Sequence, residues 1–438
     1  MDVRRRRHLL VLTAAIALVA ASCNGDDGDG TQTTGDLSGQ SIEVAAVWVS
    51  PEQERFRMVL DAFEEETGAE VQFTSTGDDI ASVLGPRIEG GDPPDVAILP
   101  QPGLLRDFAD QGVLQPLDDV VGDEMSENFA PIWQELGSVD GTLYGLYFKA
   151  ANKSTVWYNL NVFNETGASV PSTWDDLQAT AQSIADFGTP PYSIGGGDGW
   201  TLTDWFENIY IRTAGADMYD QLSNHEIPWT DESVTSALTV FGDVVGNPDQ
   251  IAGGTDGALQ TDFNTSVTQV FSDPPAAAIV YEGDFVAGVI SGETDAELGT
   301  DADFFDFPAI EGSGPAVVGG GDVAVLMTDS EAAKALLEFL ATPEAVEIWI
   351  AEGGFLSPNQ NVDLSAYPDE ITQRTAETLV AASDAGNFRF DMSDLQPSEF
   401  GATTGEGLWG ILQDFVRSPD DVDGIAEELE DAATRAFG

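Results

Sequence analysis

Cysteine and histidine are almost absent from this chain of 438 residues. It contains one cysteine, Cys23, and two histidines, His8 and His225. A single cysteine excludes a disulfide bond within the chain. A histidine-rich metal site or a Ser-His-Asp triad would have to rest on His225 alone, so both are disfavoured. The sequence therefore predicts a protein without a metal centre or a cofactor, and it does not favour an enzyme.

Basic residues are also scarce. The chain has 16 Lys and Arg residues against 77 Asp and Glu residues, which gives a net charge of −61. Such a surface repels nucleic acid and polyanionic ligands, so we expect no nucleic-acid partner and favour a neutral or cationic ligand. Carboxylates are too frequent for their spacing to indicate acid–base catalysis. A secreted glycosidase, the enzymatic alternative, would need two carboxylates held roughly 5–10 Å apart.

Long apolar runs are missing except at the amino terminus. Four arginines at residues 4–7 precede an apolar stretch at residues 9–21, which is too short for a spanning helix and suits a signal peptide over residues 1–22. Small residues then lead into Cys23, a pattern that resembles a bacterial lipobox, with Ala20 where leucine is more usual. We therefore predict that Cys23 is lipidated and anchors the chain. An ordinary signal peptide that contains a cysteine is the alternative, and the export route, general or twin-arginine, stays open.

Residues 24–40 contain almost nothing apolar and are rich in Gly, Asp, Thr and Ser. Such a segment cannot bury surface, so residues 23–40 are expected to form the lipidated cysteine and a flexible tether. An anchor, a tether and a large soluble body indicate a protein held beside a membrane on its extracytoplasmic side.

The rest of the chain alternates between apolar strand patterns and helical patterns. Residues typical of helix ends flank the predicted helices. Ser50 and Pro51 precede the first helix and Gly68 follows it, and Thr173 and Gly188 flank a later one. The alternation predicts an α/β protein with a largely parallel sheet. The predicted strands are residues 42–48, 69–74, 94–99, 155–159, 192–194, 276–281 and 322–327, and the predicted helices are 51–67, 80–88, 174–187, 331–340 and 343–351.

Several short motifs occur in an order and spacing typical of one protein family. They are VLDAFEEETG at 59–68, GDPPDV at 91–96, LYGL at 143–146 with VWYN at 156–159, PSTWDDL at 171–177 and AAKALLEFL at 332–340. Together, from about residue 42 to about residue 360, they resemble the extracellular solute-binding proteins of ATP-driven importers. The similarity is to the branch that contains maltose- and α-glucoside-binding proteins.

This resemblance implies a two-lobed, periplasmic-binding-protein-like fold of type II, with a ligand cleft between the lobes. The implied crossings between lobes lie near residues 148–156, 307–317 and 359–368. Lobe 1 would comprise residues 41–150 and 315–362, and lobe 2 residues 151–314 and 363–438. We expect such a receptor to be monomeric.

Sugars combine apolar ring faces with a rim of hydroxyls, so aromatic rings beside carboxylates or amides suit them. In an open α/β sheet these groups belong on loops beyond the carboxyl ends of strands. The predicted ligand-binding residues are Trp48, Asp79, Gln101, Trp200, Trp205, Tyr281, Glu282 and Trp409. Trp205 could instead face a lobe interior, and Trp409 fits a core position equally well. Trp157, Trp174, Trp229 and Trp349 are expected in the core.

The sequence therefore predicts a lipid-anchored substrate-binding protein of an ATP-driven (ABC) importer. Its ligand would be a carbohydrate, an α-glucoside or an oligosaccharide, which it would deliver to the permease subunits. The alternative is the same fold binding a non-sugar solute such as a peptide, a polyamine or an osmolyte.

Overall fold

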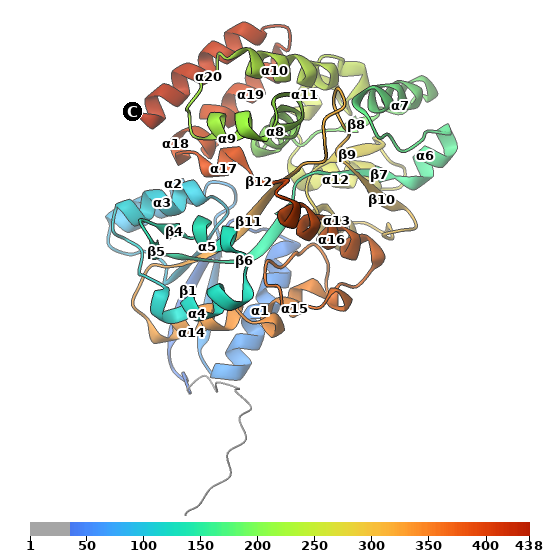
Figure 1. The fold of residues 1–438 in the computed structure, drawn as a ribbon. Helices are drawn as coiled ribbons and strands as arrows, with labels where there is room; N and C mark the ends of the chain where they lie inside the picture. The colour runs from blue at the N-terminus through green and yellow to red at the C-terminus, as the bar shows by residue number, and fades with distance from the viewer. Residues whose placement is uncertain (1–35) are drawn as a thin grey trace, which may run out of the picture. The chain divides into compact units, whose positions relative to one another are not determined.

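The computed structural model describes residues 36–438, which form one compact unit. Two main sheets organise it (Figure 1). The first runs in the order β12 (Phe388–Phe390), β11 (Val317–Leu326), β3 (Val96–Leu99), β1 (Ser41–Ala46) and β2 (Glu70–Ser75), and β6 (Gly145–Asn152) also pairs with β11. The second runs in the order β10 (Ala302–Asp306), β7 (Thr155–Asn159), β9 (Ile279–Tyr281) and β8 (Tyr192–Ser193). A small hairpin joins β4 (Ser138–Val139) to β5 (Thr142–Leu143).

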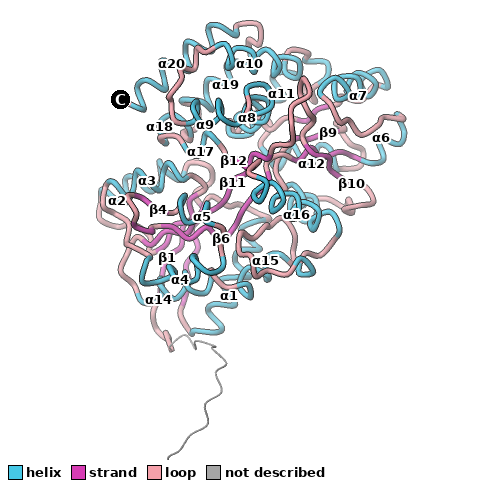
Figure 2. Tube along the Cα trace, in the orientation of Figure 1, coloured by secondary structure: helices cyan, strands magenta, loops and turns pink. Residues whose placement is uncertain are grey.

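Helices surround both groups of strands (Figure 2). Those of the first part of the chain are α1 (Glu52–Thr67), α2 (Ile80–Glu89), α3 (Pro102–Asp110), α4 (Asp118–Asn128) and α5 (Pro131–Leu136). The central part has α6 (Leu160–Thr166), α7 (Trp174–Phe187), α8 (Trp200–Ala214), α9 (Ala216–Ser223), α10 (Glu232–Val245), α11 (Gly254–Ala258), α12 (Phe263–Phe271) and α13 (Val286–Glu293). The last part has α14 (Glu331–Leu340), α15 (Pro343–Ile350), α16 (Glu370–Ala385), α17 (Met392–Leu395), α18 (Ser398–Gly401), α19 (Gly407–Arg417) and α20 (Val422–Phe437). Between residues 36 and 438, no helix has the length and apolar character that crossing a bilayer requires.

Each sheet has its own apolar core, which makes the chain two-lobed. The first core lies around β1, β3, β6 and β11, and the second around β7, β8 and β9. The four tryptophans expected in cores are buried there, with exposed fractions of 0 to 6%. The α/β class is confirmed, but the sheets are mixed rather than largely parallel. β1 runs parallel to β2 and β3, whereas β11 runs antiparallel to β3 and β6, because β6 and β11 are the segments that lead to and from the other lobe.

The residues predicted to begin and end helices α1 and α7 do so in the structure, except at the start of α1. Thr173 accepts a hydrogen bond from the backbone N–H of Asp176 at 3.2 Å, and Gly188 ends α7 in the left-handed conformation. At α1, Gly68 ends the helix as predicted, but the residue at the N-cap position is Pro51. The hydroxyl of Ser50 instead donates to the side chain of Glu54 at 2.7 Å.

Three segments connect the lobes. The first lies between β6 and β7 at residues 153–154, and the second between β10 and β11 at residues 307–316. The third lies near residue 391, because Phe390 belongs to the first core and Met392 to the second. The third crossing was predicted near residues 359–368, and this position is wrong. Strand β12 hydrogen-bonds to β11, so the segment up to residue 390, assigned to lobe 2 from the sequence, belongs largely with lobe 1.

The beginning of the described part also differs from its prediction as tether. Leu37 is 3% exposed and belongs to the first core, and its backbone N–H donates to the carbonyl of Thr67 at 2.9 Å. Leu37 therefore belongs to the folded first lobe. The predicted signal peptide, Cys23 and the tether up to residue 35 lie outside the described residues.

Candidate ligand-binding cavity

Loops from both lobes enclose a cavity of about 460 Å³. The loops after β1, β2 and β3 contribute residues of the first lobe, and those after β8 and β9 contribute residues of the second. This is the position expected for a ligand site beyond strand ends. The lining includes Trp48, Glu52, Asp78, Gln101, Lys149 and Asp322 from the first lobe, and Asp198, Trp200, Asp262, Phe263, Phe285 and Trp409 from the second. Lys153, Ser393 and Asp394, near the crossing segments, complete it.

Trp200 contributes a partly buried aromatic ring to this cavity. It is the first residue of α8, and its ring packs at 5.4 Å from the ring of Phe263 and 6.0 Å from that of Phe285. Gly199 before it has φ 88°, and a Cβ there would lie 2.8 Å from the Cβ of Trp409. Glycine at position 199 therefore permits the close approach of the segments that carry Trp200 and Trp409.

Trp409 and Trp48 are more deeply seated in the cavity wall. Trp409, on α19, is 2% exposed, and its Nε1–H has no hydrogen-bond partner among the described residues. A buried donor without an acceptor costs free energy. Trp48 is 3% exposed, and its ring meets that of Phe56 at 4.8 Å in an edge-on arrangement.

Lys149 forms a charged group on the first-lobe wall. Its Nζ lies 3.0 Å from Asp322 Oδ2 and 3.1 Å from Glu52 Oε1, and 5.4 Å from the centre of the Trp48 ring. Burial lowers the pKa of Lys149, but the attraction of Asp322 and Glu52 outweighs burial and holds this pKa above its ordinary value. The lysine therefore stays charged, and its single positive charge is shared between two carboxylates.

Asp78 of the first lobe and Asp198 of the second both line the cavity, and neither forms an ion pair with a basic side chain in the described part of the chain. Asp78 is open to water, yet the protein atoms around it, and then the charges of Asp198 and Asp79, raise its pKa to about 7, against a favourable interaction with Trp200. Burial also raises the pKa of Asp198, although Asp198 accepts a hydrogen bond from the backbone N–H of Phe263 at 2.7 Å. This side of the cavity is thus rich in acceptors and repels anions.

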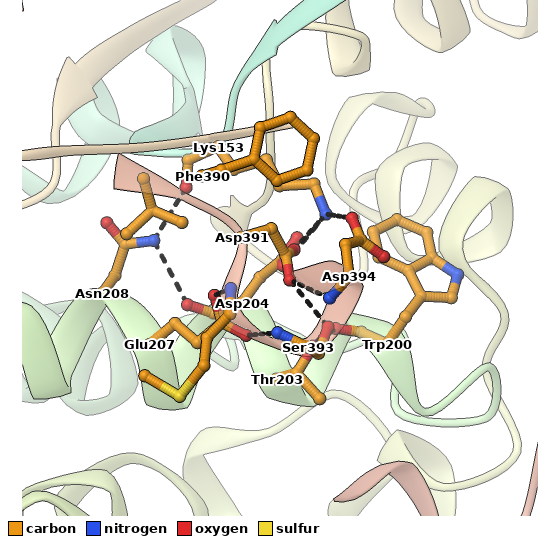
Figure 3. Close-up of polar contacts among 12 residues, drawn as sticks. Lys153, Trp200, Thr203, Asp204, Glu207, Asn208, Phe390, Asp391, Ser393 and Asp394 are labelled. Carbon is orange, nitrogen blue, oxygen red and sulfur yellow. Dashed lines mark hydrogen bonds and ion pairs between the residues drawn. The ribbon is translucent and has the colours of Figure 1, made fainter. Parts of the chain in front are cut away.

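A second lysine lies where the crossing segments meet. The Nζ of Lys153 is 2.5 Å from Asp391 Oδ2, 3.2 Å from Asp204 Oδ1 and 3.7 Å from Asp394 Oδ2 (Figure 3). These four residues form what we call the Lys153 cluster, and each is at most 8% exposed. The same Nζ lies 5.6 Å from the centre of the Trp200 ring. The cluster therefore borders the cavity through Lys153 and Asp394.

Of the eight predicted ligand-binding residues, four line the cavity and four do not. Trp48, Gln101, Trp200 and Trp409 line the cavity. Asp79 stands at the N-cap of α2, and its neighbour Asp78 is the residue in the lining. Trp205, Tyr281 and Glu282 are not in the lining and are at most 2% exposed.

The three buried residues lie behind the cavity wall for identifiable reasons. Trp205 follows Trp200 by five residues on α8, which turns its ring inward, 4.5 Å from that of Tyr281. The hydroxyl of Tyr281 donates to the carbonyls of Lys153 and Asp204, at 2.7 and 2.9 Å. Glu282 is buried and interacts with the neighbouring carboxyl group of Asp204 rather than with the cavity.

Sequence reasoning missed both lysines of the site. A signal was present: the chain has only three lysines, and Lys149 and Lys153 stand four residues apart in an apolar strand region. A buried lysine requires carboxylate partners, so its presence there pointed to a polar site.

Residues 50–347 match the family model of bacterial extracellular solute-binding proteins, and the chain belongs to this family. The osmoprotective compounds-binding protein GgtB of Synechocystis sp. is 35% identical over 417 residues, which cover 94% of this chain and 96% of GgtB. The α-glucosides-binding periplasmic protein AglE of Rhizobium meliloti is 36% identical over 396 residues, which cover 87% of this chain and 84% of AglE. The solved bacterial solute receptor AcbH has the same fold, with a TM-score of 0.77 at 21% identity over 92% of this chain and 100% of AcbH. The resemblance inferred from the short motifs is confirmed.

Proposed function

We propose that this protein is the lipid-anchored receptor of an ATP-driven importer and that it binds a small neutral carbohydrate, an α-glucoside or a related glycoside. The observation that carries the proposal is the cavity wall, where the rings of Trp200, Trp409 and Trp48 stand beside carboxylates from both lobes. Aromatic rings match the apolar faces of a pyranose, and carboxylates accept hydrogen bonds from its hydroxyls.

The size and charge of the cavity narrow the class of ligand. About 460 Å³ lies in the lower half of the range usual for small-molecule sites, which favours a mono- or disaccharide over a long oligosaccharide. Both lysines in the wall already have carboxylate partners. The wall offers an anionic ligand no free cation, so uronic acids and sugar phosphates are disfavoured. The similarity to an osmoprotective compounds-binding protein, GgtB, and to an α-glucosides-binding protein, AglE, supports an osmoprotective compound or an α-glucoside.

A polyamine is the second candidate, and a specific observation favours it. Asp78, Asp198 and Asp262 line the cavity, and no lysine or arginine forms an ion pair with them in the described part of the chain. Carboxylates of this kind, close to tryptophan rings, also suit an ammonium group. The proposal of a neutral glycoside rests on the aromatic area and on the sequence relatives.

A titration-calorimetry panel tests the proposal. It should contain maltose, trehalose, sucrose, a glucosylated polyol, glucuronate, spermidine and a tripeptide. We expect micromolar or tighter binding of at least one neutral glycoside and none of glucuronate. Binding of spermidine or the tripeptide alone would replace the carbohydrate with the alternative ligand class. The Trp200→Ala variant serves as the control for binding in this cavity.

Membrane attachment and assembly need separate tests. The Cys23→Ala variant of the full chain should fold and bind like the unchanged protein but appear in the soluble fraction of the cell envelope. Retention of this variant in the membrane fraction would contradict lipid anchoring. Sedimentation should show a monomer, and purified permease subunits in lipid should bind the ligand-loaded receptor.

A further inference from the structure

Lys153 lies on the first crossing segment, and its ion pair joins that segment to the third. Its partner Asp391 is the residue between the first and second cores, and it is fully buried. The separation of 2.5 Å between Lys153 Nζ and Asp391 Oδ2 is a short, charge-assisted hydrogen bond. Asp391 also accepts hydrogen bonds from the hydroxyl of Ser393 at 2.7 Å and the backbone N–H of Asp394 at 3.0 Å. The ion pair therefore fixes the start of α17.

Helix α8 of the second lobe also contacts Lys153 and the start of α17. Asp204, on α8, lies 3.2 Å from Lys153 Nζ. One turn later, Glu207 accepts hydrogen bonds from the backbone N–H groups of Met392 and Ser393, at 2.7 and 2.9 Å. Figure 3 shows these side chains of α8 pointing toward Lys153 and the Asp391–Asp394 segment. One helix thus holds both crossing segments.

The elements that Lys153 holds also carry cavity residues. Trp200 begins α8, one turn before Asp204, and Ser393 and Asp394 belong to α17. The hydroxyl groups of Thr203 and Ser393 lie 3.3 Å apart, a further contact between the two helices. A change in how α8 and α17 meet would therefore move the aromatic ring and the carboxyl group that face the ligand.

The Lys153 cluster contains a single cation among several carboxyl groups. Lys153 is the only basic side chain within 4 Å of Asp204, Asp391 or Asp394 in the described part of the chain, and Glu282 lies beside Asp204. Burial raises the pKa of Asp204 and of Asp394 well above the ordinary value, whereas Lys153 outweighs burial at Asp391 and lowers its pKa. The Lys153 cluster thus holds three buried carboxyl groups around one cation, and only at Asp391 does the attraction of Lys153 outweigh burial.

We propose that Lys153 is a positioning residue for ligand binding, whose ammonium group fixes α17 and the third crossing segment against α8 and thereby sets where Trp200, Ser393 and Asp394 face the ligand. The inference rests on the proposed function only in that a ligand occupies this cavity. It assigns the lysine a role in lobe closure as well, because the residues that it joins are those about which the lobes would move.

The experiment compares two double variants that each remove one buried lysine together with a partner. Lys153→Met/Asp391→Asn removes both members of the closest ion pair at the crossing segments, so that neither Lys153 nor Asp391 is left buried without the other. Lys149→Met/Asp322→Asn is the control, because it removes an ion pair in the same cavity wall whose two members both belong to strands of the first sheet. Both are made in a Cys23→Ser chain that carries spin labels at Val83→Cys and Val170→Cys, two exposed positions, one in each lobe. Pulsed electron resonance then measures the distance between the labels without ligand.

We expect the Lys153→Met/Asp391→Asn variant to unfold cooperatively, to show a broadened or shifted label distance, and to bind the glycoside about tenfold or more weakly. Lys153→Arg should restore the label distance and at least part of the affinity. The Lys149→Met/Asp322→Asn control should keep the label distance of the unsubstituted protein. An unchanged distance, or an affinity within threefold, in the Lys153→Met/Asp391→Asn variant would overturn the proposal. If the unsubstituted protein binds nothing in the panel, the proposed function fails, and the ligand-free distance alone decides the role of Lys153.

Discussion

Arg55 of α1 donates a hydrogen bond from Nη2 to the backbone carbonyl of Gly288 in α13, over 2.9 Å. The bond joins the first lobe to the second. Beside this bond, the backbones of Gly288 and Gly354 also approach closely, because neither residue has a side chain. A Cβ on Gly354 would lie 2.7 Å from the Cα of Gly288. Asn264 adds a second bond between the lobes, from Nδ2 to the carbonyl of Ser50 at 2.9 Å. The lobes are therefore held together by direct contacts in addition to those a ligand would make.

Loss of the Arg55 contact should weaken ligand binding, although Arg55 is not in the cavity lining. A ligand that is bound between two lobes gains affinity from every contact that favours closure. Replacing Arg55 with Ala removes one hydrogen bond to a buried carbonyl, worth about 0.5–1.5 kcal/mol, so calorimetry should show binding weaker by about two- to tenfold. Arg57→Ala is the control, because Arg57 is on the same helix and bonds only within the first lobe. Equal losses in both variants would contradict a role in closure.

Glu282 should make stability depend on pH. Burial raises the pKa of Glu282 from 4.5 to about 8, although a hydrogen bond with the side chain of Asp204 and the positive charge of Lys153 both act to lower it. Between these values the folded protein binds a proton that the unfolded chain releases, so Glu282 makes the folded state progressively less stable as pH rises from about 4.5 to about 8. Glutamine imitates the protonated acid and cannot lose a proton. Glu282→Gln should therefore be more stable than the unchanged protein at pH 8, by about 1 kcal/mol or more, and about equally stable at pH 5.

Urea unfolding at pH 5, 6.5 and 8 measures this difference. Glu65→Gln serves as the control, because Glu65 is exposed and its substitution removes the same formal charge. A gain for Glu282→Gln that is the same at all three pH values would show that the charge of Glu282, and not its titration, is responsible.

The fold was predictable because its signals are local. Apolar strands, the Thr173 cap and the terminal glycines Gly68 and Gly188 each specify an element through residues close in sequence. The third crossing was misplaced because it depends on β12 pairing with β11, some 70 residues earlier, and a strand of three residues has no distinctive pattern.

The site was predictable only where geometry follows from strand ends. Trp48 and Gln101 follow strands, and Trp200 follows a glycine-rich loop, so their places in the lining were foreseeable. Whether a ring at the end of a strand points to the cavity or to the core depends on neighbours distant in sequence. Tyr281 turns inward because carbonyls of Lys153 and Asp204 accept its hydroxyl hydrogen. Both acceptors are distant in sequence, so the residues next to Tyr281 do not indicate its direction.

Added salt should stabilise the protein strongly. At a net charge of −61, repulsion among surface carboxylates opposes the compact state, and salt screens it. We expect the melting temperature to rise between about 0.01 and 1 M NaCl, with most of the rise below about 0.3 M, where the Debye length shortens most. Differential scanning calorimetry at constant pH measures it, with the same ionic strength from choline chloride as the control for specific sodium binding. A flat or falling melting temperature would contradict the repulsion argument.

Trp200 provides the sharpest test of the cavity, because Trp205 on the same helix is a matched control. The Trp200 ring is only partly buried and borders the cavity, whereas Trp205 is 2% exposed and packs against Tyr281, Phe241 and Phe307. Removing the Trp200 ring should take away contact area for the ligand and leave an enlarged cavity rather than a sealed void. Trp200→Ala should therefore weaken glycoside binding by about 1–3 kcal/mol and change ligand-free stability little.

The Trp205→Ala variant should show the reverse, because a sealed cavity in the second core costs about 3–5 kcal/mol of stability. Its affinity, measured below its own melting temperature, should stay within a few-fold of the unchanged protein. Calorimetric affinity and urea unfolding of both variants separate the two roles. A large stability loss in Trp200→Ala with unchanged affinity would place that ring in the core and remove the main aromatic surface from the proposed site.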